Sequence, residues 1–427
     1  MRLRNLDKVI LFAILSLIPL LSGAQIRINS PYSRFGLGWI VDSRFETRNM
    51  AMGGIRYGIQ GAAFVNPANP ASYAAFDSAS FVLEAGLFGT MARITSEEVS
   101  ETGSYISMSH LMFGIPVTNW WRTSFGLLPY SYVGYNVYSD QEIEEIGNVQ
   151  YVFAGSGGLN QVYWGNGFRV MKGLYAGFNI KYLFGRIDRE RGAWFPNDPY
   201  MKASEVTTSF NAKDFFFDIG FQYKAKLKEK MSLTTGINYS PKVQMKTRAD
   251  YLVTGYYGKY NSAQIYIDTV EYYPRNEGTF VMPTGIGVGF ALEQQENWLI
   301  GADFSWQNWE AFEFFGQSDS LANSWTVAAG GELIPDMRSL SYGDKISYRF
   351  GGHYTQSYLN LYNTPIAEFG ISFGLGFPIR RSRTTINLSM ELGKMGTTRN
   401  NLIQENYARM TLGINIFETW FLKSKYY

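Results

Sequence analysis

The sequence predicts an all-β protein: a fourteen-stranded antiparallel transmembrane β-barrel with an N-terminal plug, or hatch, in its lumen. The first observation is composition, because 17% of the residues are aromatic, 44 are glycine and only 17% are charged. Membrane strands that are apolar on one face only give this mixture. The second observation is an alternation of apolar and polar residues from Ser80 onward. The third is an alternation of short and long connections between the predicted strands.

Residues 1–24 are predicted to be a signal peptide. Arg2, Arg4 and Lys8 precede an apolar run from Val9 to Leu21, and Ser22-Gly23-Ala24 offers a cleavage site of small residues. The run is too short to span a bilayer as a helix, and no later stretch is long enough either. The chain has no cysteine, so neither a disulfide framework nor a lipid-anchored cysteine is expected. Without the signal peptide it has 35 basic and 35 acidic residues, a balance that argues against a nucleic-acid partner.

Strands are predicted from the period of two. In the stretch Leu174 to Arg186, for example, Phe178 and Ile180 alternate with Asn179 and Lys181. The predicted strands are 80–95, 104–117, 121–137, 150–169, 174–189, 207–225, 231–246, 278–292, 297–311, 324–334, 345–355, 366–378, 384–394 and 404–417.

The connections favour a membrane barrel over a secreted β-sandwich or propeller. They run about 3 to 10 residues after the even-numbered strands and about 8 to 31 after the odd-numbered ones, as in outer-membrane barrels. A sandwich has no reason to alternate in this way. The expected domains are therefore a barrel over 80–417 and a periplasmic tail over 418–427, with both termini on the periplasmic side of a Gram-negative outer membrane, in contact with its lipid. Pro129 and Pro283 are candidate positions for a kink that opens the wall sideways.

The polar faces of the strands are predicted to point into the lumen. A charged side chain facing lipid at mid-depth would cost a few kcal/mol. We therefore expect a lumen polar network, either structural or along a substrate path, made of Glu84, Lys181, Asp218, Asp303, Arg349, Glu391 and Arg409.

Residues 25–79 have no place in the wall and are predicted to form the plug, since fourteen strands enclose more space than wall side chains fill. Its first stretch, NSPYSRFGLG, contains Pro31, Tyr32, Arg34 and Phe35. A later stretch contains Asn66-Pro67-Ala68, where small residues permit close packing of irregular backbone. A nucleotide-binding glycine loop is the weaker alternative, because no strand–loop–helix context surrounds these glycines. Glycines on the lumen face of two strands would provide smooth strips for the plug: Gly285, Gly287, Gly289, Gly374 and Gly376.

At these residues the chain resembles a known group, the FadL-type superfamily of long-chain fatty-acid transporters. Within it, the chain is most similar to the branch whose mature end begins with an SPYSRFG-like segment. The resemblance is carried by Asn66-Pro67-Ala68, GGLNQVYWGNG from Gly157, MPTGIGVGF around Pro283 and the closing ETWFLKSKYY. It implies fourteen strands and an N-terminal hatch.

The resemblance implies two possible functions. One is binding or passage of hydrophobic small molecules across the outer membrane, as in the transporters. The other is a non-transporting accessory subunit of an outer-membrane protein-secretion complex (type 9-like) or a barrel-assembly complex. The fold alone does not choose between them.

No enzyme, cofactor or metal site is expected from the sequence. The two histidines, His110 and His353, are far apart and lack paired-ligand spacing. The predicted loop 247–277 holds seven tyrosines and is the candidate contact for a partner or ligand, because amphipathic rings are common at recognition surfaces. The other interpretation is a β-hairpin that prolongs the flanking strands, with tyrosines packing across it, and the two interpretations do not exclude each other. The residues concerned are Tyr251, Tyr256, Tyr257, Tyr260 and Tyr266.

Overall fold

The structure is a computed structural model that describes residues 30–41, 46–78, 80–97, 99–198, 200–260, 264–380 and 382–419. The expected signal peptide and the tail beyond Thr419 lie outside these residues. In the described part of the chain, no helix is long and apolar enough to cross a membrane.

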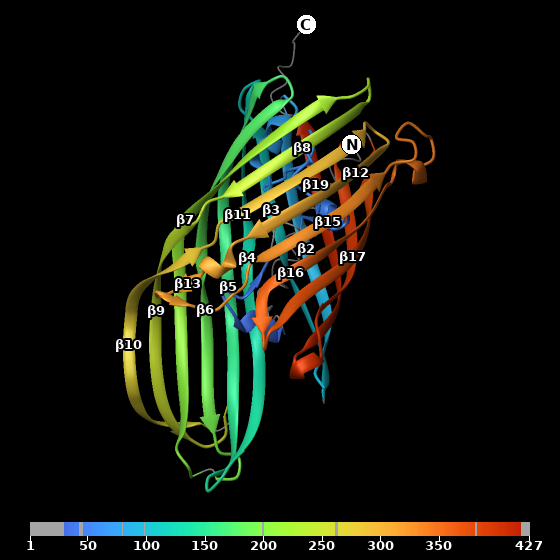
Figure 1. The fold of residues 1–427 in the computed structure, drawn as a ribbon. Coiled ribbons are helices and arrows are strands. Elements are labelled where there is room, and N and C mark those ends of the chain that lie inside the picture. The colour runs from blue at the N-terminus through green and yellow to red at the C-terminus, as the bar shows by residue number, and fades with distance from the viewer. Residues whose placement is uncertain are drawn as a thin grey trace, which may run out of the picture.

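Fourteen antiparallel strands form a closed barrel (Figure 1), which confirms the predicted fold class. The first and last strands close it, with pairs running from Ser80–Thr419 to Thr95–Gln404. In order around the wall the strands are β2 (Ser80–Thr95), β3 (Ser100–Pro116), β4 (Trp121–Ile143), β5 (Gly147–Met171), β6 (Leu174–Trp194), β7 (Ala203–Lys226), β8 (Met231–Ser240), β11 (Gly285–Gln294), β12 (Trp298–Gln307), β15 (Ser324–Leu333), β16 (Ser347–Leu361), β17 (Thr364–Pro378), β18 (Thr385–Gly396) and β19 (Gln404–Thr419).

The strands have their apolar faces outside and their small or polar faces inside. In β19, Arg409 and Thr411 are buried, whereas Met410 and Leu412 are 52% and 55% exposed. A barrel in water would have the opposite pattern, so the outer face is suited to lipid.

Two predicted strands, 231–246 and 278–292, are wrong in their extent. Neither runs as a single strand, because the ladder is interrupted between Ser240 and Val243 and again between Met282 and Gly285. Pro241 and Pro283 lie at these two breaks, and proline cannot donate to a ladder. Beyond the breaks, β9 (Val243–Tyr257) and β10 (Ile265–Met282) pair as a hairpin.

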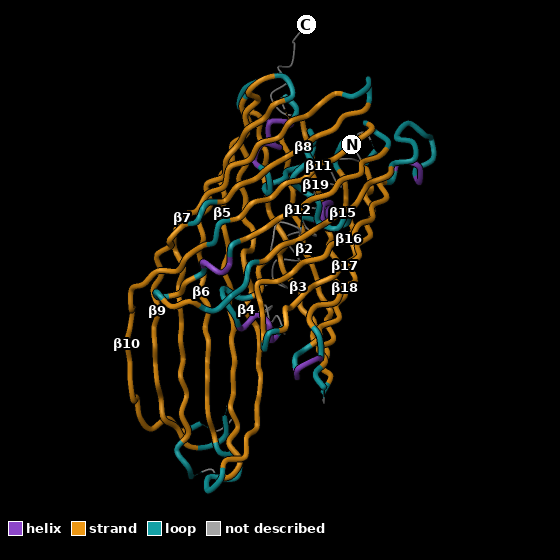
Figure 2. Tube along the Cα trace, in the orientation of Figure 1, coloured by secondary structure: helices purple, strands orange, loops and turns teal. Residues whose placement is uncertain are grey.

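The predicted long loops are mostly strand. We call the rim where Ser80 and Thr419 pair the end rim, and the opposite rim the far rim. Strands β4 to β7, together with the β9–β10 hairpin, extend well beyond the others at the far rim (Figures 1 and 2). The wall is therefore tall on one side. Residues 247–277 were predicted to be a loop, and most of them instead form the β-hairpin that was the other interpretation. Three register irregularities in β10 disturb its period of two, which explains why the sequence pattern did not reveal it.

Two segments lie outside the barrel strands. The N-terminal segment, which we define as residues 30–41 and 46–78, holds η1 (Pro31–Arg34), β1 (Trp39–Ile40), α2 (Thr47–Met50) and η3 (Pro70–Ala75). The insertion 308–323 holds η4 (Trp309–Ala311), β13 (Glu313–Phe314) and β14 (Gln317–Ser318), while η5 (Gly343–Lys345) and η6 (Arg399–Asn401) are short turns at the rims. Trp309 and Phe312 pack with Tyr32 and Leu37 in one apolar core that also includes wall residues of the tall side.

Candidate functional site

The N-terminal segment is buried against the wall, and wall glycines make room for it. A Cβ on Gly330 or Gly351 would collide with the backbone of Met52. A Cβ on Gly287 would collide in the same way with the Tyr57 ring. Backbone approaches the wall this closely only where no side chain intervenes.

The glycine strips expected from the sequence divide into two groups. Gly287, Gly289 and Gly374 lie against the N-terminal segment, at Tyr57 or Ala51. Gly285 and Gly376 instead face wall side chains, those of Gln307 and Arg349 for example. The contact glycines Gly330 and Gly351 were missed, although each lies in a Gly-Gly pair that could have indicated it.

Asn66, Pro67 and Ala68 form a buried turn that is fastened to the segment and to the wall. Asn66 Nδ2 donates to the carbonyl oxygens of Arg56 (2.6 Å) and Ile59 (3.1 Å). The backbone N–H of Ala68 donates to Asn66 Oδ1 at 3.3 Å. The Pro67 carbonyl accepts a hydrogen bond from Asn179 Nδ2 of β6 at 2.9 Å. The turn therefore lies near the end rim, where β6 begins.

Pro31, Tyr32, Arg34 and Phe35 lie in a different place, towards the far rim. Pro31 begins η1, and the Tyr32 hydroxyl donates to the Ile403 carbonyl in the turn between β18 and β19. The Arg34 guanidinium lies 4.3 Å from the centre of the Phe153 ring. Phe35 packs against the apolar core that contains Trp309 and Phe312. Close by, β1 pairs with β4 through Trp39–Tyr132.

The seven predicted lumen charges are all inside the barrel but form several small groups rather than one network. Two of them hold backbone of the N-terminal segment: Asp303 accepts from the N–H groups of Arg56 (2.5 Å) and Tyr57 (2.9 Å), and Glu84 accepts from Val65 N–H (3.0 Å). The others pair within the wall: Lys181 with Asp218, Arg409 with Glu391, and Arg349 with Glu332.

One charged contact between the N-terminal segment and the wall was not predicted from the sequence. Arg48 of α2 donates from Nη2 to Glu332 Oε1 at 3.1 Å, and Arg349 of β16 donates from Nε to Glu332 Oε2 at 2.6 Å. Glu46 caps α2 by accepting from the N–H groups of Arg48 and Asn49, both at 2.9 Å. Glu332 follows the Gly330-Gly331 pair in β15 and lies opposite Arg349 of β16. This pairing depends on strand register, so the sequence pattern did not indicate it.

A cavity of about 190 Å³ lies between the N-terminal segment and the tall side of the wall. Its inner lining includes Tyr32, Phe216 and Tyr358, and Lys181 contributes a charge. The lining is thus mixed, with aromatic rings and a few polar groups, as in many small-molecule sites.

The same cavity reaches the wall at the level of the strand breaks. Pro241, Pro283 and Ile286 line it there, and Ile286 is 41% exposed on the outer face. Residues 213–218 of β7 have no ladder partner in β8 or β9. At this point of the wall, ladder bonds are missing on one side and two proline breaks lie on the other. Of the two predicted kink positions, Pro283 lies at this break, whereas Pro129 lies at a register irregularity between β4 and β5.

The five predicted tyrosines do not form one exposed surface. Tyr256 is fully buried and Tyr260 is 6% exposed, so as placed they cannot contact a partner; Tyr251 is half-buried. Tyr257 and Tyr266 are 39% and 55% exposed. Burial and the neighbouring Glu190 carboxylate raise the pKa of Tyr260 well above its ordinary value, and its hydroxyl donates to Glu190 Oε2 at 3.1 Å. Two of the five therefore hold the hairpin on the wall.

The closed wall with its apolar outer face defines a membrane β-barrel, and its fold is of the FadL type. The CymD monoaromatic hydrocarbon channel superposes with a TM-score of 0.57 at 12% identity, over 90% of this chain and 98% of that one. A FadL homologue of Pseudomonas aeruginosa gives 0.55 at 12% identity, over 90% and 100%. The Ralstonia pickettii toluene transporter TbuX gives 0.57 at 13% identity, over 87% and 97%. Identities this low establish the fold alone.

The chain belongs to the BamG family, which it matches over residues 6–427. Among proteins of curated function, none matches the sequence. The superpositions confirm the FadL-type resemblance for the fold. The narrower branch with the SPYSRFG-like start stays a prediction.

Proposed function

We propose that this protein is an outer-membrane barrel of a Gram-negative bacterium that acts as a non-transporting accessory subunit of a barrel-assembly complex. The N-terminal segment would be its plug and the end rim would face the periplasm. The match to the BamG family supports this choice over a type 9-like secretion complex and over transport. The buried contacts of the plug with wall backbone and with Glu332 favour a permanent seal.

The observation that carries the proposal is the exposure of β10. Residues 265–277 are exposed on both faces of the strand, and the apolar ones among them include Ile267 (49%), Val270 (61%) and Tyr272 (57%). Large apolar side chains exposed to this extent on one edge strand are typical of protein–protein contact sites. Pro274 and the register irregularities oppose addition of a further strand at this edge. We therefore expect a partner protein to contact side chains rather than extend the sheet.

Replacing Ile267, Val270 and Tyr272 together by serine should release the partner. Native protein extracted in a mild detergent is expected to co-purify with other outer-membrane proteins, and the triple variant should retain at least about tenfold less of them, a loss of about 1.4 kcal/mol or more. The measurement is intact-mass analysis of the purified assembly.

Tyr138→Ser/Ile146→Ser is the matched control, because both residues are 48% exposed on the β4–β5 hairpin of the tall side, which β6 and β7 separate from the β9–β10 hairpin. Equal loss in both variants would mean that the surface is not specific. A wild-type barrel that purifies alone would contradict the proposal.

Binding of a small hydrophobic molecule is the second candidate function, favoured by the cavity that meets the outer face at Ile286. Its volume of about 190 Å³ is below the roughly 300–1,000 Å³ of drug-sized ligand sites. A single-ring hydrocarbon is therefore a better match than a long acyl chain.

Ser305→Phe should abolish such binding, because Ser305 lines the cavity and a phenyl ring would occupy it. Toluene is expected to stabilise the wild type in a thermal melt and the variant at least about tenfold less effectively. Val288→Phe, on the outer face of β11 (39% exposed), is the control that should bind as wild type does. Absence of any toluene effect on the wild type would exclude this function.

A further inference from the structure

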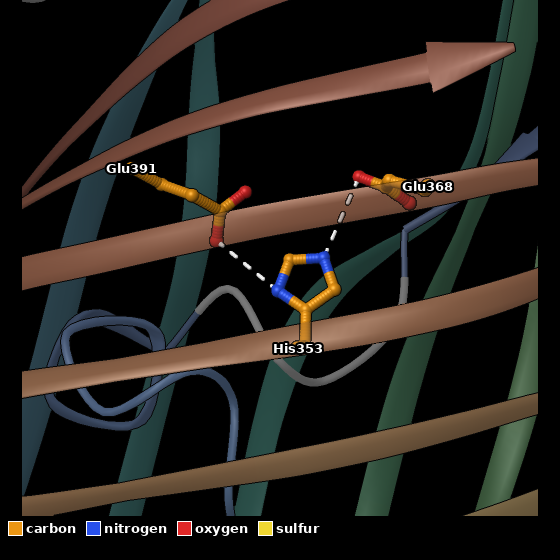
Figure 3. A group of neighbouring side chains, drawn as sticks. All are labelled: His353, Glu368 and Glu391. Carbon is orange, nitrogen blue, oxygen red and sulfur yellow. Dashed lines mark ion pairs between the residues drawn. The ribbon is translucent and has the colours of Figure 1, made fainter.

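Three ionisable side chains on three neighbouring strands converge inside the barrel. His353 of β16 lies between Glu368 of β17 and Glu391 of β18, with one ring nitrogen directed at each carboxylate (Figure 3). The distances are 3.8 Å from Nε2 to Glu368 Oε1 and 3.9 Å from Nδ1 to Glu391 Oε2. One donor atom from each residue lies within 4.8 Å of the other two.

Glycines in the same rows make room for the group. Gly370 pairs with both His353 and Gly393 across the ladders. A Cβ on Gly370 would lie 2.5 Å from His353 Cε1, so the imidazole lies flat over β17. A Cβ on Gly393 would collide with the ring of Tyr407. The two glycines thus let side chains of β16 and β19 reach the carboxylates of Glu368 in β17 and Glu391 in β18.

The imidazole is buried without a hydrogen-bond partner. His353, Glu368 and Glu391 are 5%, 6% and 4% exposed, and within the described residues neither ring nitrogen has a partner. The N–O distances are too long for hydrogen bonds, which favour 2.7–3.2 Å. Each distance by itself matches two ligands that share one metal ion, since zinc–nitrogen and zinc–oxygen bonds are each about 2.0–2.2 Å long. A single ion would bind only one of the two ring nitrogens, and one donor atom from each of the three residues does lie within 4.8 Å of the other two.

Both carboxylates are held in place by side chains of β19. The Tyr407 hydroxyl lies 2.6 Å from Glu368 Oε1 and 3.1 Å from Glu391 Oε1, and Arg409 Nη1 lies 2.8 Å from Glu391 Oε1. These contacts leave Glu391 Oε2 to face His353. Hydrogen bonds of this kind orient the ligands of metal sites.

A small cavity of about 30 Å³ adjoins the group and is lined by Glu368, Glu405, Tyr407 and Arg409. A space of this size holds a water molecule, which needs at least about 10–15 Å³. Water could therefore complete the coordination of an ion held by three protein ligands.

We propose that His353, Glu368 and Glu391 bind one divalent transition-metal ion, with Zn²⁺ as the best match. One imidazole and two carboxylates are ordinary zinc ligands, whereas Ca²⁺ and Mg²⁺ take oxygen ligands only. The ion would tie β16, β17 and β18 together on their inner face. This site is independent of the proposed role in a complex, and no sequence pattern indicates it because its ligands come from three separate strands.

The test is a titration of the full-length purified protein in detergent with Zn²⁺ after treatment with a chelator. The wild type is expected to bind one equivalent, and His353→Gln and Glu391→Gln are expected to bind at least about 100-fold more weakly, since loss of supporting contacts alone costs 10–100-fold. His110→Gln is the matched control: His110 is also buried (2% exposed) and lies over Gly86 of the wall, but its Nδ1 has a hydrogen-bond partner in Ser109 Oγ, at 2.7 Å.

Several results would overturn the proposal. One is a wild type that binds no Zn²⁺ and whose imidazole is doubly protonated by ¹⁵N NMR, since the group would then be a histidinium between two carboxylates. Equal Zn²⁺ binding by the wild type and both ligand variants would overturn it too. The stoichiometry of the wild type decides the question even if a variant fails to fold, and a Zn²⁺-dependent rise of its melting temperature supports the site.

Discussion

Gly53→Ala is expected to lower the free energy of unfolding by about 2–5 kcal/mol and to expose the N-terminal segment to protease. Gly53 has φ +71°, a left-handed conformation that costs a residue with a Cβ about 1–2 kcal/mol. A Cβ there would also lie 2.5 Å from the backbone nitrogen and oxygen of Gly352 in β16. Overpacking of this kind adds about 1–3 kcal/mol. The Gly53 N–H also donates to Ser372 Oγ at 2.8 Å, so any shift of the segment loses this bond.

Gly316→Ala provides the control for backbone strain alone. Gly316 has φ +73°, but a Cβ there would meet nothing within 4 Å. Urea unfolding of both variants in lipid vesicles should therefore show a difference of about 1–3 kcal/mol, which measures the contact between segment and wall. Equal losses would mean that the segment moves away from β16 at little cost, which would contradict a permanent plug.

Glu332→Gln is expected to cost about 3–5 kcal/mol, because it leaves Arg48 and Arg349 buried without their shared counter-charge. The Glu332 side chain is 10% exposed and Arg349 is 4% exposed, so water cannot replace the carboxylate. Arg48 belongs to the N-terminal segment and Arg349 to the wall, and their repulsion should push the two apart. The measurement is the free energy of unfolding together with protease cleavage within 46–78.

The matched control is Glu277→Gln, which removes a pair with Arg248 in which both side chains are largely exposed (73% and 65%). This change should stay within about 1 kcal/mol. A double-mutant cycle of Arg48→Met and Glu332→Gln then isolates the contact between segment and wall. A coupling energy near zero would show that Glu332 serves the wall alone, through Arg349.

The sequence predicted the barrel well because its main signal is local. Alternation in stretches such as Leu174 to Arg186 follows from the pleat of a single strand and needs no tertiary information. The pattern failed at Val243 to Met282, where register irregularities and many tyrosines hide the period, and where β10 is exposed on both faces. A strand with the same environment on both faces has no amphipathic signature to detect.

The inside of the barrel could be predicted only in part. That Asp303 and Glu84 face inward follows from alternation, and so does the inward position of Glu391. Their partners do not follow, because the partners depend on register and on where the N-terminal segment lies. Asp303 holds the backbone of Arg56 and Tyr57, and Glu391 faces His353 two strands away.

The sequence by itself therefore determined a fourteen-stranded membrane barrel and which side chains face inward, because one strand's alternation and the lengths of its turns suffice for both. Only the tertiary structure decided the tall side of the wall, the cavity at the strand breaks, the Arg48–Glu332–Arg349 contact and the grouping of His353 with two carboxylates. Each of these joins residues that are distant along the chain, and their relative positions are fixed by strand register and by packing of the N-terminal segment, which no local pattern encodes.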